Sequence, residues 1–154
     1  GMRLGEAAGL HLDDIRLNGP IPYIDLKPHP WRSLKTKGSE RCIPLIVVAL
    51  WAARRIVENS MESKLAFLRY CNEVACNANS ASNGLNKWLH QTMAKRVVIH
   101  SFRHSLRDRL RAVECPTEVV DAIGGAQVAS IGQRYGNGYP LKVLMTWLTK
   151  IGLD

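Results

Sequence analysis

Five polar side chains have the types and the chain order that suit chemistry on a phosphodiester: Arg3, Lys37, His100, Arg103 and Tyr135. Two arginines can bind the non-bridging oxygens of a phosphate and stabilise the charge that develops in the transition state. We expect Arg3 and Arg103 to do so. Tyr135 is the candidate nucleophile, because a phenol with a reference pKa near ~10 can attack once cations or a base lie beside it. His100 can hydrogen-bond the phosphate or assist proton movement, and Lys37 can protonate the departing oxygen.

Taken singly, each of these residues is weak evidence, because charged and phenolic side chains are common on protein surfaces. Position alone favours a solvated loop charge for Lys37. Glu6 follows Arg3 by three residues, so on a helix it can hold the Arg3 guanidinium. The alternative is an exposed ion pair worth less than ~1 kcal/mol. In the order Arg, Lys, His-x-x-Arg, Tyr, however, the set is specific, and it predicts cleavage of a phosphodiester through a covalent tyrosine intermediate.

The elements that must position this set can be predicted from apolar periodicity and turn signals. We expect a helix over residues 2–12 to carry Arg3 and Glu6. Short strands are expected over 21–27, 31–34 and 40–45. A hairpin tip over 35–39 would let Lys37 reach into a cleft beside the sheet. Further helices are predicted over 46–58, 61–77, 85–95, 101–113, 117–123 and 141–151, with a loop over 77–84.

Local signals mark several helix ends near the candidate residues. Ser101 is the expected N-cap of the helix that carries Arg103. The pair Gly124-Gly125 is expected to end the helix before Tyr135. Tyr135 itself is expected on a short helix. The apolar stripe of 141–151 is expected to pack against the rest of this chain.

The whole pattern predicts one α+β domain over residues 1–154, mostly α-helical, with a small three-stranded antiparallel sheet. This length is enough for a hydrophobic core. The 21 Lys and Arg against 13 Asp and Glu leave a formal net charge of +8, which indicates an anionic partner, most commonly nucleic acid. The alternative is that the charge serves only solubility. No apolar run approaches the ~18 residues that a membrane span needs.

The four cysteines are Cys42, Cys71, Cys76 and Cys115. Zinc ligands usually come as two closely spaced pairs, and these cysteines do not. We interpret all four as ordinary thiols in a reducing cytosol.

Four stretches resemble the motifs of a known enzyme family. Residues 1–10 are similar to its first arginine motif, and residues 34–45 resemble its β-hairpin lysine motif. The segment from His100 to Arg103 matches its His-x-x-Arg box, and residues 123–136 match its tyrosine box. On these motifs the chain resembles the catalytic domain of the tyrosine recombinases, the phage-type integrases, over essentially its whole length.

The resemblance implies a reaction and a set of roles. Arg3 and Arg103 would bind the scissile phosphate, with Glu6 supporting Arg3. Tyr135 would form a 3′-phosphotyrosine link to DNA, and Lys37 would be the general acid for the 5′-oxygen. Family members act in site-specific recombination and integration, need neither a metal nor a nucleotide cofactor, and assemble as tetramers on double-stranded DNA. The expected location is the cytoplasm, at the nucleoid, for a bacterial or phage-encoded protein.

The sequence departs from the family at Ala126, where members usually carry His or Trp nine residues before the tyrosine. A residue that would hydrogen-bond the phosphate or buttress the tyrosine segment is missing there, which bears on the rate more than on the reaction class. Lys35 is an alternative to Lys37. Tyr139 is an alternative to Tyr135, although it lacks the preceding arginine.

Two other functions stay open at this point. A degenerate copy would bind DNA without cleaving it. Ala126 favours this, as does our expectation that the chain is a fragment lacking the N-terminal DNA-binding arm and the first catalytic-domain helices. A type IB topoisomerase would share the chemistry, although the motif wording is phage-like. His11 and His104 are expected to be structural or surface residues.

Overall fold

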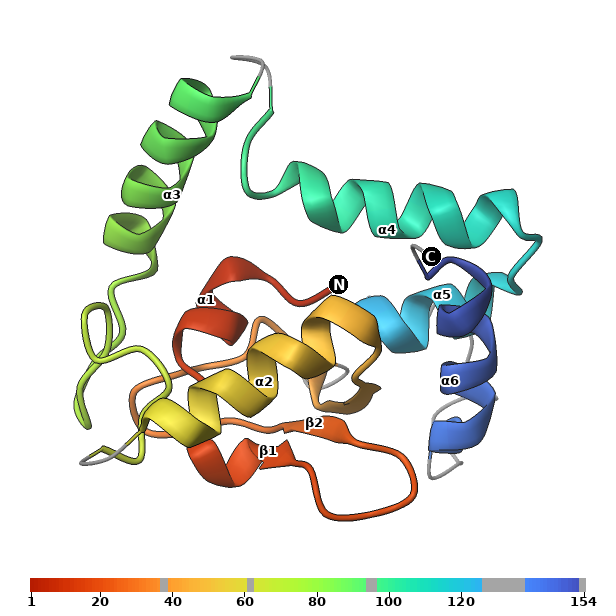
Figure 1. Ribbon diagram of the computed structural model, residues 1–154, viewed down its shortest axis with the longest axis horizontal. Helices are drawn as coiled ribbons and strands as arrows, with labels where there is room; N and C mark the ends of the chain where they lie inside the picture. The colour runs from red at the N-terminus through yellow and green to blue at the C-terminus, as the bar shows by residue number, and fades with distance from the viewer. Residues whose placement is uncertain (37–38, 61–62, 94–96, 126–137, 153–154) are drawn as a thin grey trace.

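The computed structural model describes residues 1–36, 39–60, 63–93, 97–125 and 138–152 (Figure 1). Within them the helices are α1 (Leu4–Ala8), α2 (Val47–Asn59), α3 (Ala78–Thr92), α4 (Ser101–Ala112), α5 (Thr117–Gly124) and α6 (Leu141–Lys150). A 3-10 helix η1 (Leu12–Asp14) precedes strands β1 (Ile15–Arg16), β2 (Tyr23–Leu26) and β3 (Arg41–Pro44). The predicted α+β class, mostly helical with a three-stranded antiparallel sheet, is confirmed.

The sheet has the strand order β1-β2-β3, and β2 runs antiparallel to both neighbours. Ile24 of β2 pairs with Ile15 on one side and with Ile43 on the other. These three side chains are buried in one cluster with Ala53 of α2. Because strand residues alternate between faces, one face of this short sheet can be apolar, and in Figure 1 α2 lies across the sheet.

The predicted strand over 31–34 is wrong. The third strand of the sheet is β1 instead, at the edge beside β2. The backbones of His29 and Arg32 exchange two hydrogen bonds of 3.0 Å, which close a tight turn. The Arg32 guanidinium is then buried, and it donates to Asp14 Oδ2 at 2.9 Å and to the Gly9 carbonyl at 2.9 Å. Asp14 is 0% exposed and also bonds His29 Nε2 at 2.8 Å. A buried carboxylate requires such partners, and this requirement outweighs the local strand propensity.

The predicted helices over 2–12 and 61–77 are shorter or absent in the structure. The first ends at Ala8, and the described part of the second, from residue 63, forms turns instead. The reason is a backbone pairing between the two segments. Leu12 N donates to the Lys64 carbonyl at 2.7 Å, and Ala66 N donates to the Leu10 carbonyl at 2.9 Å.

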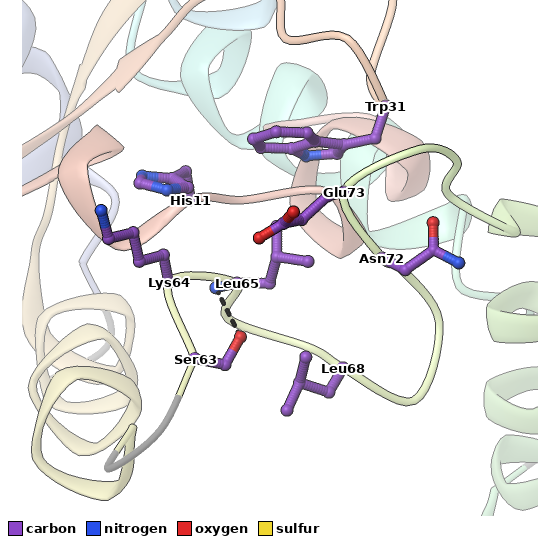
Figure 2. A pocket seen from close by; sticks show the side chains of 8 residues that line it. All are labelled: His11, Trp31, Ser63, Lys64, Leu65, Leu68, Asn72 and Glu73. Atoms are coloured by element: carbon purple, nitrogen blue, oxygen red, sulfur yellow. Dashed lines mark hydrogen bonds between the residues drawn. The ribbon is translucent and has the colours of Figure 1, made fainter.

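A cavity of about 400 Å³ opens beside this pairing (Figure 2). It is lined by His11, Trp31, Ser63, Lys64, Leu65, Leu68, Asn72 and Glu73. His11 has a structural role here, as expected, because its Nδ1 accepts from Asp13 N at 3.1 Å and its ring lies 5.8 Å from that of Trp31. None of Arg3, His100 and Arg103 lines the cavity.

The predicted loop over 77–84 is also wrong, because α3 begins at Ala78. The Asn77 side chain caps the helix by accepting from Ser80 N at 2.9 Å. Asparagine is a strong N-cap, so a stretch rich in Asn, Ser and Ala starts a helix here. Ser101, by contrast, is not the N-cap of α4. His100 occupies that position, and the Ser101 hydroxyl accepts from Val98 N at 3.2 Å.

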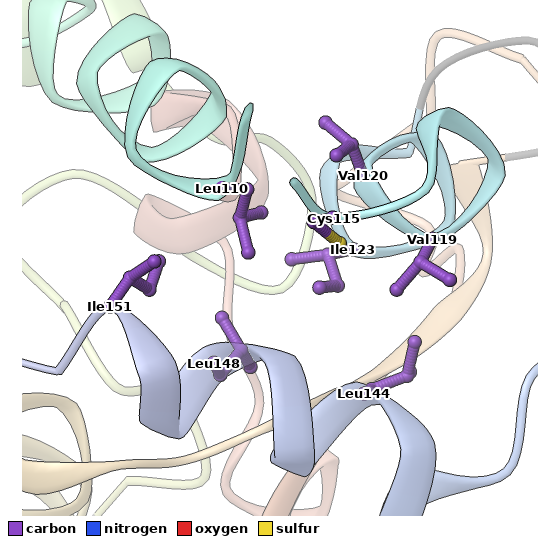
Figure 3. Close-up of a cluster of buried hydrophobic side chains, with 8 residues drawn as sticks. All are labelled: Leu110, Cys115, Val119, Val120, Ile123, Leu144, Leu148 and Ile151. Carbon is purple, nitrogen blue, oxygen red and sulfur yellow. The ribbon is translucent and has the colours of Figure 1, made fainter. Parts of the chain in front are cut away.

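The C-terminal helices share a second core (Figure 3). Leu148 of α6 points toward Leu110 of α4 and Ile123 of α5, and Leu144 of α6 points toward Val119 of α5. The apolar stripe of α6 therefore packs within this chain, as expected. No helix among those described is long and apolar enough to cross a membrane.

The prediction that all four cysteines are free thiols is wrong for two of them. Cys71 and Cys76 are joined by a disulfide, whereas Cys42 and Cys115 are free. Asn72 makes the pairing possible, because its Oδ1 accepts from Val74 N at 2.9 Å and from Ala75 N at 2.8 Å. This side-chain-stabilised turn folds the chain back between the two cysteines.

Candidate active site

Arg3 and Glu6 form the first part of the site, at the N-terminus of α1. Arg3 is the N-cap residue, and its backbone N–H donates to Glu6 Oε2 at 2.8 Å. Its guanidinium Nη1 donates to Glu6 Oε1, also at 2.8 Å. The Glu6 side chain is only 4% exposed, whereas that of Arg3 is 28% exposed. The ion pair is therefore a partly buried one, with part of Arg3 open to solvent.

A second arginine shares the Glu6 carboxylate. Arg41 is the first residue of β3, and its Nη2 donates to Glu6 Oε2 at 2.9 Å. The sequence reasoning assigned Arg41 no role. The available signal was a charged residue that opens an otherwise apolar strand, Arg41 to Pro44, four residues after Lys37 in sequence.

The C-terminus of α5 supplies backbone acceptors to both arginines. Arg3 Nη2 donates to the Gly125 carbonyl at 3.2 Å, and Arg41 Nε donates to the Ile123 carbonyl at 3.0 Å. The last carbonyls of a helix lack intrahelical partners and carry partial negative charge. Cations are therefore favoured at this point. Gly125 adopts a left-handed conformation with φ of 64°, and a Cβ there would overlap the Arg41 guanidinium.

Arg103 reaches the same end of α5 from the first turn of α4. A Cβ placed on Gly124 would lie 3.8 Å from Arg103 Nη2, and Arg103 Nη1 donates to the Gly1 carbonyl. Burial, followed by the positive charges of Arg3 and Arg41, lowers the pKa of Arg103 below its usual value. The structure thus brings Arg3 and Arg103 together, although 100 residues of sequence separate them. Two guanidinium groups bind the Glu6 carboxylate and that of Arg103 lies beside the same end of α5, so a bound anion would relieve the repulsion among the three.

The remaining predicted residues lie at the borders of this cluster or outside the described part of the chain. His100 is exposed at the start of α4, and its ring makes an edge contact with that of His104, with centroids 4.8 Å apart. Lys37, Ala126 and Tyr135 lie outside the described residues. The alternative nucleophile Tyr139 is exposed just before α6.

Ser39 links the turn after Lys37 to the arginines. It is 0% exposed, and its hydroxyl accepts from Arg3 Nη1 at 3.3 Å and bonds the Thr36 hydroxyl at 3.1 Å. Ser39, which follows Lys37 by two residues in sequence, therefore lies directly against Arg3. No group of three or more His, Cys, Asp or Glu side chains suited to a metal ion occurs in the part of the chain that the structure describes.

Comparison with known proteins adds an independent finding. The sequence model described as the phage integrase family matches residues 1–140. The chain belongs to the phage integrase family. No curated protein and no solved structure gave a match. Membership implies site-specific recombination in general and DNA as the partner, consistent with the catalytic domain of a tyrosine recombinase. The matched range contains all three arginines of the cluster and ends just before α6.

The Glu6 carboxylate makes the stability of this chain depend on pH. Burial alone would raise the pKa of Glu6, but hydrogen bonds from Arg41 and Arg3 outweigh it, so the pKa lies below the ordinary value of 4.5. A lowered pKa in the folded state adds stability above the unfolded-state value, and this stability is lost as the pH falls through the folded value.

We therefore expect Glu6→Gln to lower the free energy of unfolding by about 2–3 kcal/mol near pH 7, since it leaves buried charged donors short of an acceptor. The gap between wild type and variant should begin to shrink as the pH falls below 4.5, where the unfolded chain binds the proton, and should be smallest below the lower pKa of the folded state, where the native carboxylate is protonated too. Urea unfolding at several pH values measures both. Asp108→Asn removes an exposed ion pair with Arg111 and should change the free energy by less than about 0.5 kcal/mol. A gap that stays constant with pH would contradict the assignment.

Proposed function

We propose that this chain is the catalytic domain of a site-specific DNA recombinase, which cleaves DNA by transesterification through a 3′-phosphotyrosine intermediate. The observation that carries the proposal is the meeting of Arg3 and Arg103 at the Gly124–Gly125 end of α5. Two arginines from distant segments at one solvent-accessible point suit a phosphodiester, whose two non-bridging oxygens accept their paired N–H groups. From the family we further infer double-stranded DNA as substrate, a tetrameric assembly on it, a bacterial or phage origin and action in the cytoplasm.

Each step of the proposed reaction has a residue assigned to it. Arg3 and Arg103 bind the non-bridging oxygens and stabilise the additional negative charge of the pentavalent transition state. The Tyr135 oxygen gives up its phenolic proton to the surrounding water and attacks phosphorus, forming the Tyr–O–P bond while the bond from phosphorus to the 5′-oxygen breaks. Lys37 donates a proton to that leaving oxygen, and His100, one turn before Arg103, hydrogen-bonds the phosphate. The covalent link conserves the energy of the broken bond, so that a second DNA 5′-hydroxyl can reverse the step.

Covalent capture tests this proposal without knowledge of the DNA site. The chain is incubated with a pool of duplexes that carry randomised sequence around a nick close to the expected cleavage point. After cleavage the short fragment diffuses away, which prevents religation, and a denaturant-resistant protein–DNA adduct accumulates. Peptide mapping should place the DNA on Tyr135. Binding without any adduct would instead favour the degenerate, DNA-binding copy that Ala126 suggests, and absence of both would overturn the proposal.

The affinity of the chain for duplex DNA should fall steeply as the salt concentration rises. Each phosphate that the chain neutralises contributes about 0.9 to the slope of log affinity against log salt on duplex DNA. This measurement separates a binding-competent but inactive chain from one that does not recognise DNA.

Lys37→Ala is expected to slow adduct formation about 10²- to 10³-fold on an ordinary phosphodiester, the range typical of a lost general acid. With a 5′-bridging sulfur in place of the leaving oxygen the loss should nearly disappear. A thiol has a pKa near ~8.5 and leaves as a thiolate without needing a proton. Single-turnover rates on both substrates give the comparison. Lys35→Ala is the matched control, and a substrate-dependent loss in that variant instead would make Lys35 the general acid.

A further inference from the structure

Arg41 connects three segments that are distant in sequence. Its side chain is 7% exposed, and its guanidinium donates to Glu6 Oε2 at 2.9 Å, to the Ile123 carbonyl at 3.0 Å and to the Ser39 carbonyl at 2.6 Å. The three acceptors belong to α1, to the C-terminal turn of α5 and to the residues before β3. All three kinds of guanidinium nitrogen, Nε, Nη1 and Nη2, are used.

Each of these segments leads to a different group of the proposed reaction. Glu6 holds the Arg3 guanidinium at 2.8 Å. Ser39 follows Lys37 by two residues in sequence, and Ile123 lies in the last turn of α5, the helix that precedes Tyr135 in sequence. One buried side chain therefore contacts the carboxylate that holds Arg3, a residue two positions after Lys37 in sequence and the C-terminal turn of α5.

We propose that Arg41 is a positioning residue for DNA cleavage, which holds Glu6, and through it Arg3, in place against Ser39 and the C-terminal turn of α5 without touching the phosphate itself. This inference rests on the proposed function. Its basis is geometric, because a guanidinium presents five N–H donors in a rigid plane and can satisfy three acceptors that lie in different directions. A lysine ammonium at the same place keeps the charge, but a compact group at the end of a flexible chain cannot reproduce the planar arrangement.

Gly125 supplies an independent way to disturb the same contact. Its φ of 64° and the closeness of the Arg41 guanidinium leave no room for a Cβ. Gly125→Ala therefore displaces Arg41 while leaving its charge and its sequence position unchanged. If alignment by Arg41 matters, Gly125→Ala and Arg41→Lys should produce the same kinetic defect.

The experiment compares Arg41→Lys, Arg41→Gln and Gly125→Ala with the wild-type 154-residue chain. The probe is a nicked duplex that the wild type captures from the randomised pool. Single-turnover adduct rates at saturating DNA should fall about 100-fold in all three variants, the cost expected for misplacing reacting groups by about an ångström. The Kd for the same duplex should stay within about threefold of wild type. Arg16→Gln, an exposed change on β1, is the matched control and should alter neither quantity.

A double-mutant cycle adds a readout that a purely structural role would not produce. If Arg41 acts by holding Glu6 and hence Arg3, the double variant Glu6→Gln with Arg41→Gln should cleave no more slowly than the slower single variant. If the two substitutions acted independently of each other, their losses in cleavage rate would multiply instead.

Several outcomes overturn the inference. An Arg41→Lys rate within about threefold of wild type would mean that charge alone suffices. A Kd that weakens by the same factor as the rate would make Arg41 a phosphate ligand rather than a positioning residue. Both results leave the proposed function intact, because the wild type still forms its adduct. A wild type that forms no adduct on any duplex would overturn both proposals together.

Discussion

Tyr135→Phe is expected to abolish the covalent protein–DNA adduct and to leave DNA affinity unchanged. The substitution removes only the oxygen that would bond to phosphorus, while the arginines that attract the DNA stay in place. Loss of a nucleophile lowers the rate of covalent catalysis by about 10⁴-fold or more. Adduct formation on the captured nicked duplex measures the rate, and fluorescence anisotropy with an intact duplex of the same sequence measures the affinity.

Tyr139→Phe is the matched control for this prediction. Tyr139 is exposed, lies four residues after Tyr135 and loses the same single oxygen in its variant. It should form the adduct at the wild-type rate. The reverse result, with Tyr139→Phe inactive and Tyr135→Phe active, would identify Tyr139 as the nucleophile. An adduct that survives in both variants would exclude a tyrosine mechanism at either position.

Arg103→Ala and Arg3→Ala are each expected to slow adduct formation by about 10²- to 10³-fold at saturating DNA, the cost of removing one donor from a developing negative charge. Lysine at position 103 should restore only part of the rate, because an ammonium cannot make the bidentate contact. The double variant should lose less than the product of the two single losses, since both side chains would bind one phosphate. Single-turnover rates give all of these values.

The stability of these variants should move differently from their activity. The charges of Arg3 and Arg41 oppose that of Arg103 and help to lower its pKa, so removing Arg103 relieves a repulsion. The free energy of unfolding of Arg103→Ala should therefore be lower than that of the wild type by no more than about 0.5 kcal/mol, as for a surface substitution.

Arg109→Ala provides the control for net charge. Arg109 lies on the same helix, α4, and is exposed. Its substitution by alanine removes the same single positive charge as Arg103→Ala. Its adduct rate should stay close to that of the wild type. An equal loss in Arg109→Ala and Arg103→Ala would show that overall charge, rather than the Gly124–Gly125 location, governs cleavage.

Apolar periodicity in the sequence was sufficient to predict the bounds of a helix where that helix packs one continuous apolar stripe onto its neighbours. Helices α2, α4, α5 and α6 lie within a few residues of their predicted bounds, because their partners only need an apolar surface. The predictions over 31–34 and 61–77 were wrong where a specific distant partner decides the backbone. Arg32 turns inward to reach Asp14, and the chain at Lys64 pairs with Leu12.

The same distinction applies to the candidate site. The pair Arg3 and Glu6 follows from a three-residue spacing on one helix, and the spacing from His100 to Arg103 is equally local. Arg41 could not be assigned this way, because its acceptors are a carboxylate 35 residues away, a carbonyl 82 residues away and one close by in a turn.

By itself, the sequence indicated the integrase family, predicted phosphodiester chemistry and located helices α2, α4, α5 and α6, because motifs and apolar periodicity are local properties of the chain. Only the tertiary structure decided which strands form the sheet, that Cys71 and Cys76 are joined, and that Arg3, Arg41 and Arg103 meet at the end of α5. These features depend on hydrogen bonds and charges between residues far apart in sequence. Their energies arise only when the folded chain brings the partners within a few ångströms of each other.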